Sequence, residues 1–214
     1  MGSEMCIRDR VIACNNQNVK EIIHISALGV SDSAPSEYLR SKHAAEKILE
    51  QFNGNSVILR PSVVFGPGDS FMNLFAKMQK YSPIMPMALT KTKFQPIYIN
   101  DLIEIILRCI SMIKKKKIET YECVGPEIFT LYEIIKFSGI YSGRKAMVIP
   151  LPKFVGLIQA FILEKIPGPT LMSRDNIASM SVPSIATKNK KLVFRLEQPT
   201  SIRKAAPKFL SKGK

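Results

Sequence analysis

Two short apolar stretches with a tyrosine–lysine helix between them restrict this chain more than any other feature. Residues 21–26 read EIIHIS and residues 56–59 read SVIL, and both runs are apolar and rich in β-branched residues. Such runs predict strands of the kind that parallel sheets bury on both faces. Tyr38 and Lys42 lie between them, four residues apart, on one face of a predicted helix. This order of elements predicts part of a doubly wound α/β fold.

The predicted helix has its own start signal. Residues 27–37 are rich in Ser, Gly, Asp and Pro, which predicts a loop, and Ser36 is a suitable N-cap. From residue 38 to residue 52 the apolar positions lean to one side, which predicts a helix packed on a sheet.

Three polar features are expected to meet at one edge of the sheet. Ser26 ends the first strand, Pro61 follows the second, and Tyr38 begins the helix between them. In doubly wound folds, ligands bind at the carboxyl ends of the strands, where all three features fall. A phenol beside an ammonium makes an acid/base group that works near neutral pH, because the cation lowers the tyrosine pKa from about 10. We therefore predict that Tyr38 and Lys42 act as a pair.

The rest of the chain alternates helical and extended patterns. The predicted elements are a helix over 71–81, a buried helix over 102–113, an edge strand from residue 121, a helix opened by a capping box at 130–133, an amphipathic helix over 154–163 and a weakly ordered basic tail over 188–214. The last third is therefore expected to be mainly helical.

The net charge of +14 favours an anionic partner, such as a nucleotide, an acidic protein surface or anionic lipid. Nucleic acid is not expected, because no recognition motif is present and the aromatic residues do not alternate with basic ones. The simpler alternative is a general enrichment in lysine. The four cysteines lack paired or metal-ligand spacing, which predicts reduced intracellular thiols and no metal site.

Several stretches together resemble one protein family. They read HISALG (24–29), EYLRSKHAAEKIL (37–49), ILRPSVVFGPGDSFMNLFAKM (58–78), QPIYINDL (95–102), YECVGPEIFTLYEI (121–134) and SRDNI (173–177). The chain resembles the extended and atypical short-chain dehydrogenase/reductases, which include NAD-dependent epimerases and dehydratases. Within them it is most similar to the NAD(P)H-binding accessory subunits of respiratory complex I.

The resemblance implies roles for particular residues. Tyr38 would be the general acid/base, and Lys42 would lower its pKa and bind the nicotinamide ribose. Ser26 would orient a substrate carbonyl or a polar group of the cofactor, or would only end its strand. Pro61, Ser62, Val63 and Val64 would line the nicotinamide pocket of a bound NADP or NAD. Arg60 is expected to form a structural ion pair.

The resemblance also implies a division of the chain. Residues 1–10 look like a non-native segment, residues 11–150 like a partial NAD(P)-binding Rossmann-like domain, and residues 151–187 like a helical C-terminal subdomain before the basic tail at 188–214. The fold class expected is thus the C-terminal part of a doubly wound domain with a small α-rich region. The chain is expected to be an N-terminally truncated fragment.

Two functions remain open at this point. One is a complex I accessory or assembly protein with a mainly structural cofactor, partnered by complex I subunits and by peripheral membrane contact through its basic C-terminal region. The other is an active NAD(P)-dependent oxidoreductase or epimerase with an unknown small substrate. The short spacing from Ser26 to Tyr38 argues against sugar nucleotides. The expected location is cytoplasmic, on the inner face of a bacterial inner membrane, or the matrix side in a mitochondrion.

We predict weak or absent dinucleotide binding by the 214-residue chain alone. The glycine-rich turn that grips a pyrophosphate in this fold is missing from the sequence, because Gly66-Pro-Gly68 is too short and stands too late in the chain. A fluorescence titration with NADPH measures this directly, and tight, saturable binding would contradict the prediction.

Overall fold

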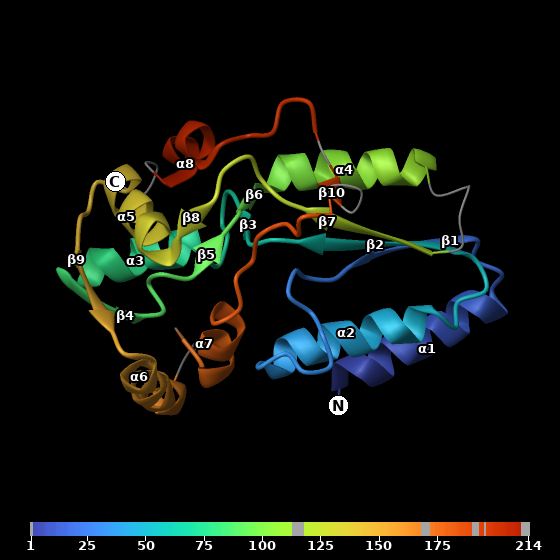
Figure 1. Cartoon of the computed structure of the whole chain (residues 1–214), viewed down its shortest axis with the longest axis horizontal. Helices are drawn as coiled ribbons and strands as arrows, with labels where there is room; N and C mark the ends of the chain where they lie inside the picture. Colours follow the sequence, from blue (N-terminus) through green and yellow to red (C-terminus); the bar gives the residue numbers. More distant parts are fainter. Residues whose placement is uncertain (1, 113–117, 168–171, 190–192, 195, 211–214) are drawn as a thin grey trace.

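The computed structural model of the chain has two lobes that lie side by side (Figure 1). It describes residues 2–112, 118–167, 172–189, 193–194 and 196–210. One lobe is built on a parallel sheet, and the other consists mainly of helices around a separate core. The site described below lies where the two lobes meet.

The first lobe is organised by a four-stranded parallel sheet. Its strands are β1 (Glu21–Ile25), β2 (Asn55–Pro61), β7 (Ile118–Cys123) and β10 (Val193–Phe194), in the order β1-β2-β7-β10. The register pairs Ile23 with Val57. The predicted α/β fold with parallel strands is confirmed. The predicted edge strand from residue 121 is wrong, since β7 bonds to β2 on one side and to β10 on the other.

Helices cover both faces of this sheet (Figure 1). On one face lie α1 (Gly2–Asn16) and α2 (Glu37–Leu49), and on the other lies α4 (Ile99–Met112). Phe52 and Ile58 belong to the core beneath α1 and α2, whereas Leu59 and Ile105 belong to the core beneath α4. Since α1 is continuous from Gly2 to Asn16, the fold shows no break at residue 10.

Strand β1 is less buried than the sequence predicts. It was expected to be covered on both faces, but its residues are only half-buried or exposed, and Ile25 is 42% exposed. Within the described part of the chain, β1 pairs with β2 alone and forms one edge of the sheet. An edge strand has fewer neighbours to cover it, which accounts for the difference.

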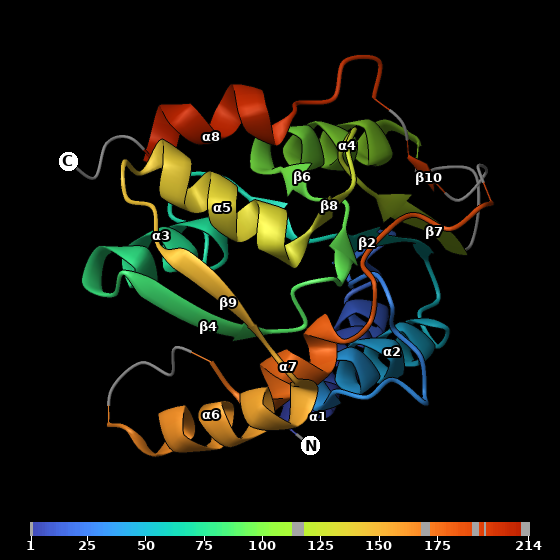
Figure 2. The same cartoon turned by 60° about the vertical axis from the view of Figure 1, so that its left-hand side comes forward.

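The second lobe gathers segments from across the chain (Figure 2). Its helices are α3 (Met72–Tyr81), α5 (Leu131–Tyr141), α6 (Lys153–Lys165), α7 (Arg174–Met180) and α8 (Ile202–Leu210). Its strand pairs are β4 (Ile84–Ala88) with β9 (Met147–Leu151) and β5 (Lys93–Phe94) with β8 (Phe129–Thr130). The pair β3 (Val64–Phe65) with β6 (Ile97–Tyr98) leads into it from the sheet. The second lobe therefore contains α3, β4 and α5 in addition to the helices that the sequence predicts over 151–187.

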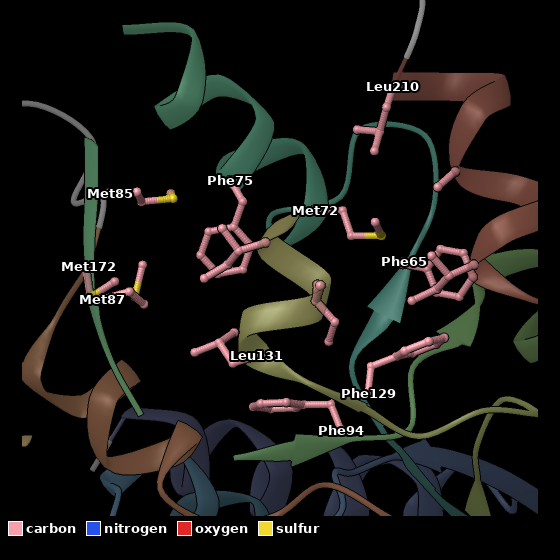
Figure 3. Packing of buried hydrophobic residues seen from close by; sticks show 14 of the residues in the cluster. Phe65, Met72, Phe75, Met85, Met87, Phe94, Phe129, Leu131, Met172 and Leu210 are labelled. Carbon is pink, nitrogen blue, oxygen red and sulfur yellow. The ribbon is translucent and has the colours of Figure 1, made fainter. Parts of the chain in front are cut away.

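A large apolar core holds the second lobe together (Figure 3). Phe75 from α3, Met87 from β4 and Leu131 from α5 point toward one another in its centre. All three side chains are at most 3% exposed. Burying side chains of this size stabilises the fold by roughly 1.5–3 kcal/mol each, so this core contributes strongly to holding the second lobe together.

Helix α6 confirms the predicted helix over 154–163 but packs through an unexpected face. Gly156 and Ala160 are buried, and a Cβ added at Gly156 would lie 2.4 Å from the Cβ of Ala88 on β4. Phe154, Ile158 and Ile162 are each more than half exposed. The helix therefore approaches β4 closely through its small residues and leaves an apolar stripe outward. No helix in the described ranges combines the length and the apolar character needed to cross a membrane.

The predicted weakly ordered tail over 188–214 is largely structured where it is described. Phe194 belongs to β10, and α8 buries Ile202, Ala206 and Leu210 in the core of the second lobe. Residues 190–192, 195 and 211–214 lie outside the described residues. Helix α8 was not predicted because basic residues dominate the composition of the segment. Its few apolar residues nevertheless share one helical face.

An ion pair fastens α2 to the central strand. The Arg60 guanidinium donates to both carboxylate oxygens of Glu46, at 2.9 Å and 2.5 Å. Burial is the largest single effect and acts to raise the pKa of Glu46, but the hydrogen bonds and charge of Arg60, together with Ser26 and the His43 charge, outweigh it and hold this pKa below its usual value. Glu46 is 6% exposed, so the pair is largely shielded from water. The predicted structural role of Arg60 is confirmed.

We expect Glu46→Gln to lower the free energy of unfolding by about 1–3 kcal/mol at pH 7, because a buried charge-assisted hydrogen bond is lost. Chemical denaturation measures this change. The folded-state pKa of Glu46 is lowered, so the stabilisation is present above the unfolded pKa of about 4.3 and is lost as pH falls through the folded value. The difference between variant and parent should therefore shrink in acid.

The matched control is Glu104→Gln on α4. Glu104 pairs with Arg108, but both side chains are about half exposed, and such pairs contribute roughly 0–1 kcal/mol. Equal effects of the two substitutions would contradict the role assigned to Glu46.

Candidate functional site

The carboxyl ends of β1 and β2 form the floor of the site. Beyond β1, the Ser26 amide donates to the Leu59 carbonyl at 2.7 Å, and the Leu28 amide donates to the Pro61 carbonyl at 3.0 Å. The parallel ladder therefore continues past the strand ends. It holds Ser26, which is 2% exposed, beside Pro61 at the same edge of the sheet.

The first turn of α2 is capped from two directions. Ser36 is the N-cap, as predicted, and its Oγ accepts a hydrogen bond from the Leu39 amide at 3.2 Å. The carboxylate of Asp175, on α7, accepts from the Glu37 amide at 2.7 Å and from the Tyr38 amide at 3.2 Å. Three free amides at a helix start are thus satisfied, and the negative charge suits the positive end of the helix dipole.

Tyr38 and Lys42 lie on one face of α2, as the sequence predicts. The Lys42 ammonium lies 6.0 Å from the centre of the Tyr38 ring and donates a hydrogen bond to the Ile25 carbonyl at 3.0 Å. Although Tyr38 as a whole residue is 47% exposed, desolvation of the phenol raises its pKa. A lowering of this pKa by Lys42 stays a prediction.

All the residues predicted for the site line one cavity of about 760 Å³. They are Ser26, Tyr38, Lys42, Pro61, Ser62, Val63 and Val64. The structure thus brings together residues from the two strand ends, the helix start and the segment after β2. Their individual roles in binding or catalysis stay predictions.

The segment after β2 is held by contacts on both sides. The Ser62 amide donates to the Cys123 carbonyl at 2.9 Å, and its Oγ donates to the Ser184 carbonyl at 2.7 Å. The Val63 carbonyl accepts from the Ile97 amide at 3.0 Å. Because Ser62 uses its hydroxyl to hold the segment around residue 184, its backbone and that of its neighbours form the cavity wall.

Two polar groups near the cavity are incompletely satisfied. Ser26 Oγ is buried and makes no hydrogen bond of good geometry within the described part of the chain, although the Glu46 carboxylate interacts with it loosely. His24 Nε2 is also buried without such a partner among the described residues. Burial and then the Lys42 charge lower the pKa of His24, which favours its neutral form. Since buried hydroxyls are usually paired, Ser26 is free to bind a ligand atom.

Sequence reasoning missed one complete wall of the cavity. Phe71, Leu74, Phe75, Phe94, Met172, Asp175, Met180, Val182 and Ser184 also line it. They come from α3, α7 and the segments beside them in the second lobe. The one sequence feature that pointed to this wall was the stretch SRDNI at 173–177. It contains Asp175 but predicts no contact with α2. In the described ranges, no group of three or more His, Cys, Asp or Glu side chains is placed to hold a metal.

Comparison with known proteins identifies relatives of this site and fold. A family model described as Male sterility protein matches residues 9–109. The chain is 31% identical to the mitochondrial NADH dehydrogenase [ubiquinone] 1 alpha subcomplex subunit 9 of Dictyostelium discoideum, over 72% of this chain and 44% of the relative. It is 27% identical to the protein of the same name from Arabidopsis thaliana, over 84% of this chain and 47% of the relative. The chain thus spans less than half the length of these relatives.

A solved structure supports the fold. The dTDP-4-dehydrorhamnose reductase of Bacillus anthracis, determined in complex with NADP, superposes with a TM-score of 0.60. The match has 17% sequence identity and covers 98% of this chain and 70% of that one. At this identity the likeness shows a shared fold, and it places both lobes of the chain within a known architecture.

We expect Asp175→Ala to loosen the start of α2. Losing a helix cap typically costs about 1 kcal/mol, so the unfolding free energy should fall by roughly that amount. Hydrogen exchange should accelerate at the Glu37 and Tyr38 amides, which lose their acceptor, while the amides of β2 stay protected. Asp32→Ala is the matched control, because Asp32 is an exposed carboxylate that pairs with Lys47. Unchanged exchange at Glu37 and Tyr38 in Asp175→Ala would contradict the assignment.

Proposed function

Because this chain belongs to the extended short-chain dehydrogenase/reductase family, in the group of the complex I accessory subunits, we propose that it is an NAD(P)-binding protein of the accessory-subunit type. Its cofactor is mainly structural, and it associates with the NADH:ubiquinone oxidoreductase or its assembly. The observation that carries this proposal is the similarity to two alpha subcomplex subunits over more than two thirds of the chain.

The residues around the cavity fit the nicotinamide end of NAD or NADP. Ser26 Oγ has an unmet hydrogen-bonding capacity at the cavity, and the Tyr38 hydroxyl and Lys42 ammonium are polar groups suited to a ribose. The backbone from Pro61 to Val64 provides a firmly held wall for the ring. A bound nicotinamide supplies a site that accepts or donates hydride. The protein side chains hold and orient that ring and exclude water from it.

A mainly structural cofactor agrees with the state of the tyrosine. A general acid/base works best when its pKa lies near the operating pH, but burial moves the Tyr38 pKa upward from its ordinary value near 10. Lys42 directs its hydrogen bond to the Ile25 carbonyl. In this arrangement Tyr38 and Lys42 are suited to binding polar groups of the cofactor.

The second candidate is an active NAD(P)-dependent oxidoreductase or epimerase. It is favoured by the convergence of Ser26, Tyr38 and Lys42 on one cavity, because this set is able to bind a substrate oxygen and move a proton to it. Turnover would then need cofactor binding to bring the Lys42 ammonium closer to the phenol and so lower the Tyr38 pKa.

We also propose a location for the chain. The two relatives are named as mitochondrial, so we assign this chain to the matrix side of a mitochondrial inner membrane, or to the inner face of a bacterial one. Peripheral contact is supported by the outward stripe of Phe154, Ile158 and Ile162 on α6, which has Lys153 and Lys165 at its two ends. Apolar side chains flanked by lysines suit an anionic lipid surface.

Sedimentation of the tagged chain with respiratory membranes tests this proposal. We expect the chain to remain with complex I subunits after detergent extraction and affinity purification, because the association is with protein. Anionic liposomes free of protein should bind it more weakly, and high salt should release it from them. Recovery without any complex I subunit would contradict the proposal.

Tyr38→Phe separates the two candidates. For a structural subunit, the variant should co-purify as the parent does, because the ring is kept. For an enzyme, NAD(P)-dependent turnover by the full-length protein should fall by about 10²–10⁴-fold with loss of the proton-transfer group. Tyr132→Phe on α5 is the matched control, since Tyr132 is similarly exposed but does not line the cavity.

A further inference from the structure

The cavity beside Tyr38 is lined by more apolar than polar residues. From the sheet lobe, Ser26, Tyr38 and Lys42 supply hydroxyl and ammonium groups. The second lobe supplies the polar residues Ser70, Asn176, Ser179 and Ser184, and its apolar lining residues are Phe71, Leu74, Phe75, Phe94, Met172, Met180 and Val182. Phe75, Phe94 and Met172 also reach into the core of that lobe, which fixes their positions (Figure 3). The apolar wall is therefore part of a rigid structure.

The charges at the cavity are already engaged. Lys42 and Asp175 are the only charged side chains among the described residues that line it. Lys42 donates to the Ile25 carbonyl, and Asp175 accepts from the Glu37 and Tyr38 amides. Although the chain carries a net charge of +14, none of the other basic side chains in the described ranges lines this space. Among these residues a diphosphate group would find no free cation in the cavity, and burying it unpaired would be costly.

The size of the space suits a small organic molecule. A volume of about 760 Å³ lies within the range of roughly 300–1,000 Å³ that is usual for ligand sites. Such sites combine apolar walls with a few polar groups that set the orientation of the ligand. Here the Ser26 Oγ, which makes no hydrogen bond of good geometry with any described residue, and the Tyr38 hydroxyl are those groups.

We propose that this cavity binds an uncharged, predominantly apolar molecule that carries one carbonyl or hydroxyl group. The oxygen of the ligand lies at Ser26 and Tyr38, and its apolar body lies against Leu74 and Met180. This inference rests on the proposed function in one respect, because it treats the same cavity as the place where the nicotinamide end is held. It adds the chemical class of a second ligand for this cavity, besides the cofactor.

The test uses prodan, a fluorescent naphthyl ketone with the required chemistry, and the purified 214-residue chain. We expect saturable binding with a blue shift of the emission, displaced by methyl nonyl ketone and unaffected by UDP-glucose. Leu74→Gln should weaken binding by about tenfold, because it places an unpaired amide against the ligand. Met180→Gln, on α7 rather than α3, should act in the same direction. Thermal unfolding confirms that each variant is folded.

Matched controls exclude binding elsewhere. Leu107→Gln makes the same change on α4, where the side chain is 61% exposed, and Ile158→Gln alters the outward stripe of α6. Neither should change the affinity for prodan. The inference is overturned if UDP-glucose displaces the probe, if no saturable binding occurs, or if a control weakens binding as much as Leu74→Gln does. These outcomes do not depend on complex I association, which is measured separately, so the two proposals fail independently.

Discussion

Strand β2 is bonded on both sides, and this constraint brings the site residues of the sheet lobe to one edge of the sheet. Its residues pair in parallel with β1 and with β7, so the carboxyl ends of all three strands face the same way. Ser26 and Pro61 become neighbours through this pairing, although Pro61 stands 35 positions after Ser26 in the sequence. The crossover through α2 then returns Tyr38 to the same edge.

The second lobe supplies the part of the cavity lining that the sheet lobe lacks. The sheet lobe supplies Ser26, Tyr38 and Lys42 to the cavity, whereas α3, α7 and the segments beside them supply many of its apolar side chains and also Asp175. Asp175 couples the two, because its carboxylate satisfies backbone amides at the start of α2. The chemistry of the site therefore depends on α7 as much as on the strand ends, and a change in either lobe alters the surroundings of Tyr38.

Local patterns were readable in the sequence, and long-range packing was not. The two strands around α2, the Ser36 cap and the Thr130–Glu133 capping box follow from short-range rules, and the structure confirms them. The interior position of β7 depends on β10, a two-residue strand from a basic segment with no periodic signal. Likewise, Asp175 acts through a contact with α2 that no spacing rule connects to Tyr38. The edge of the sheet at which the cavity lies was thus predictable. The apolar wall of the cavity and the second cap of α2, Asp175, were not.

The contact between Asp175 and the first turn of α2 has a consequence for the order of folding. Asp175 lies 138 positions after Glu37 and 137 positions after Tyr38, so this contact closes one of the longest loops in the chain. Contacts of such separation carry a larger loop-closure entropy than the adjacent β1–α2–β2 unit, which forms from local neighbours. During synthesis, α2 leaves the ribosome well before α7 exists. A nascent chain therefore contains the β1–α2–β2 unit before it contains the α7 residues that complete the cavity, so ligand binding depends on segments that are made later.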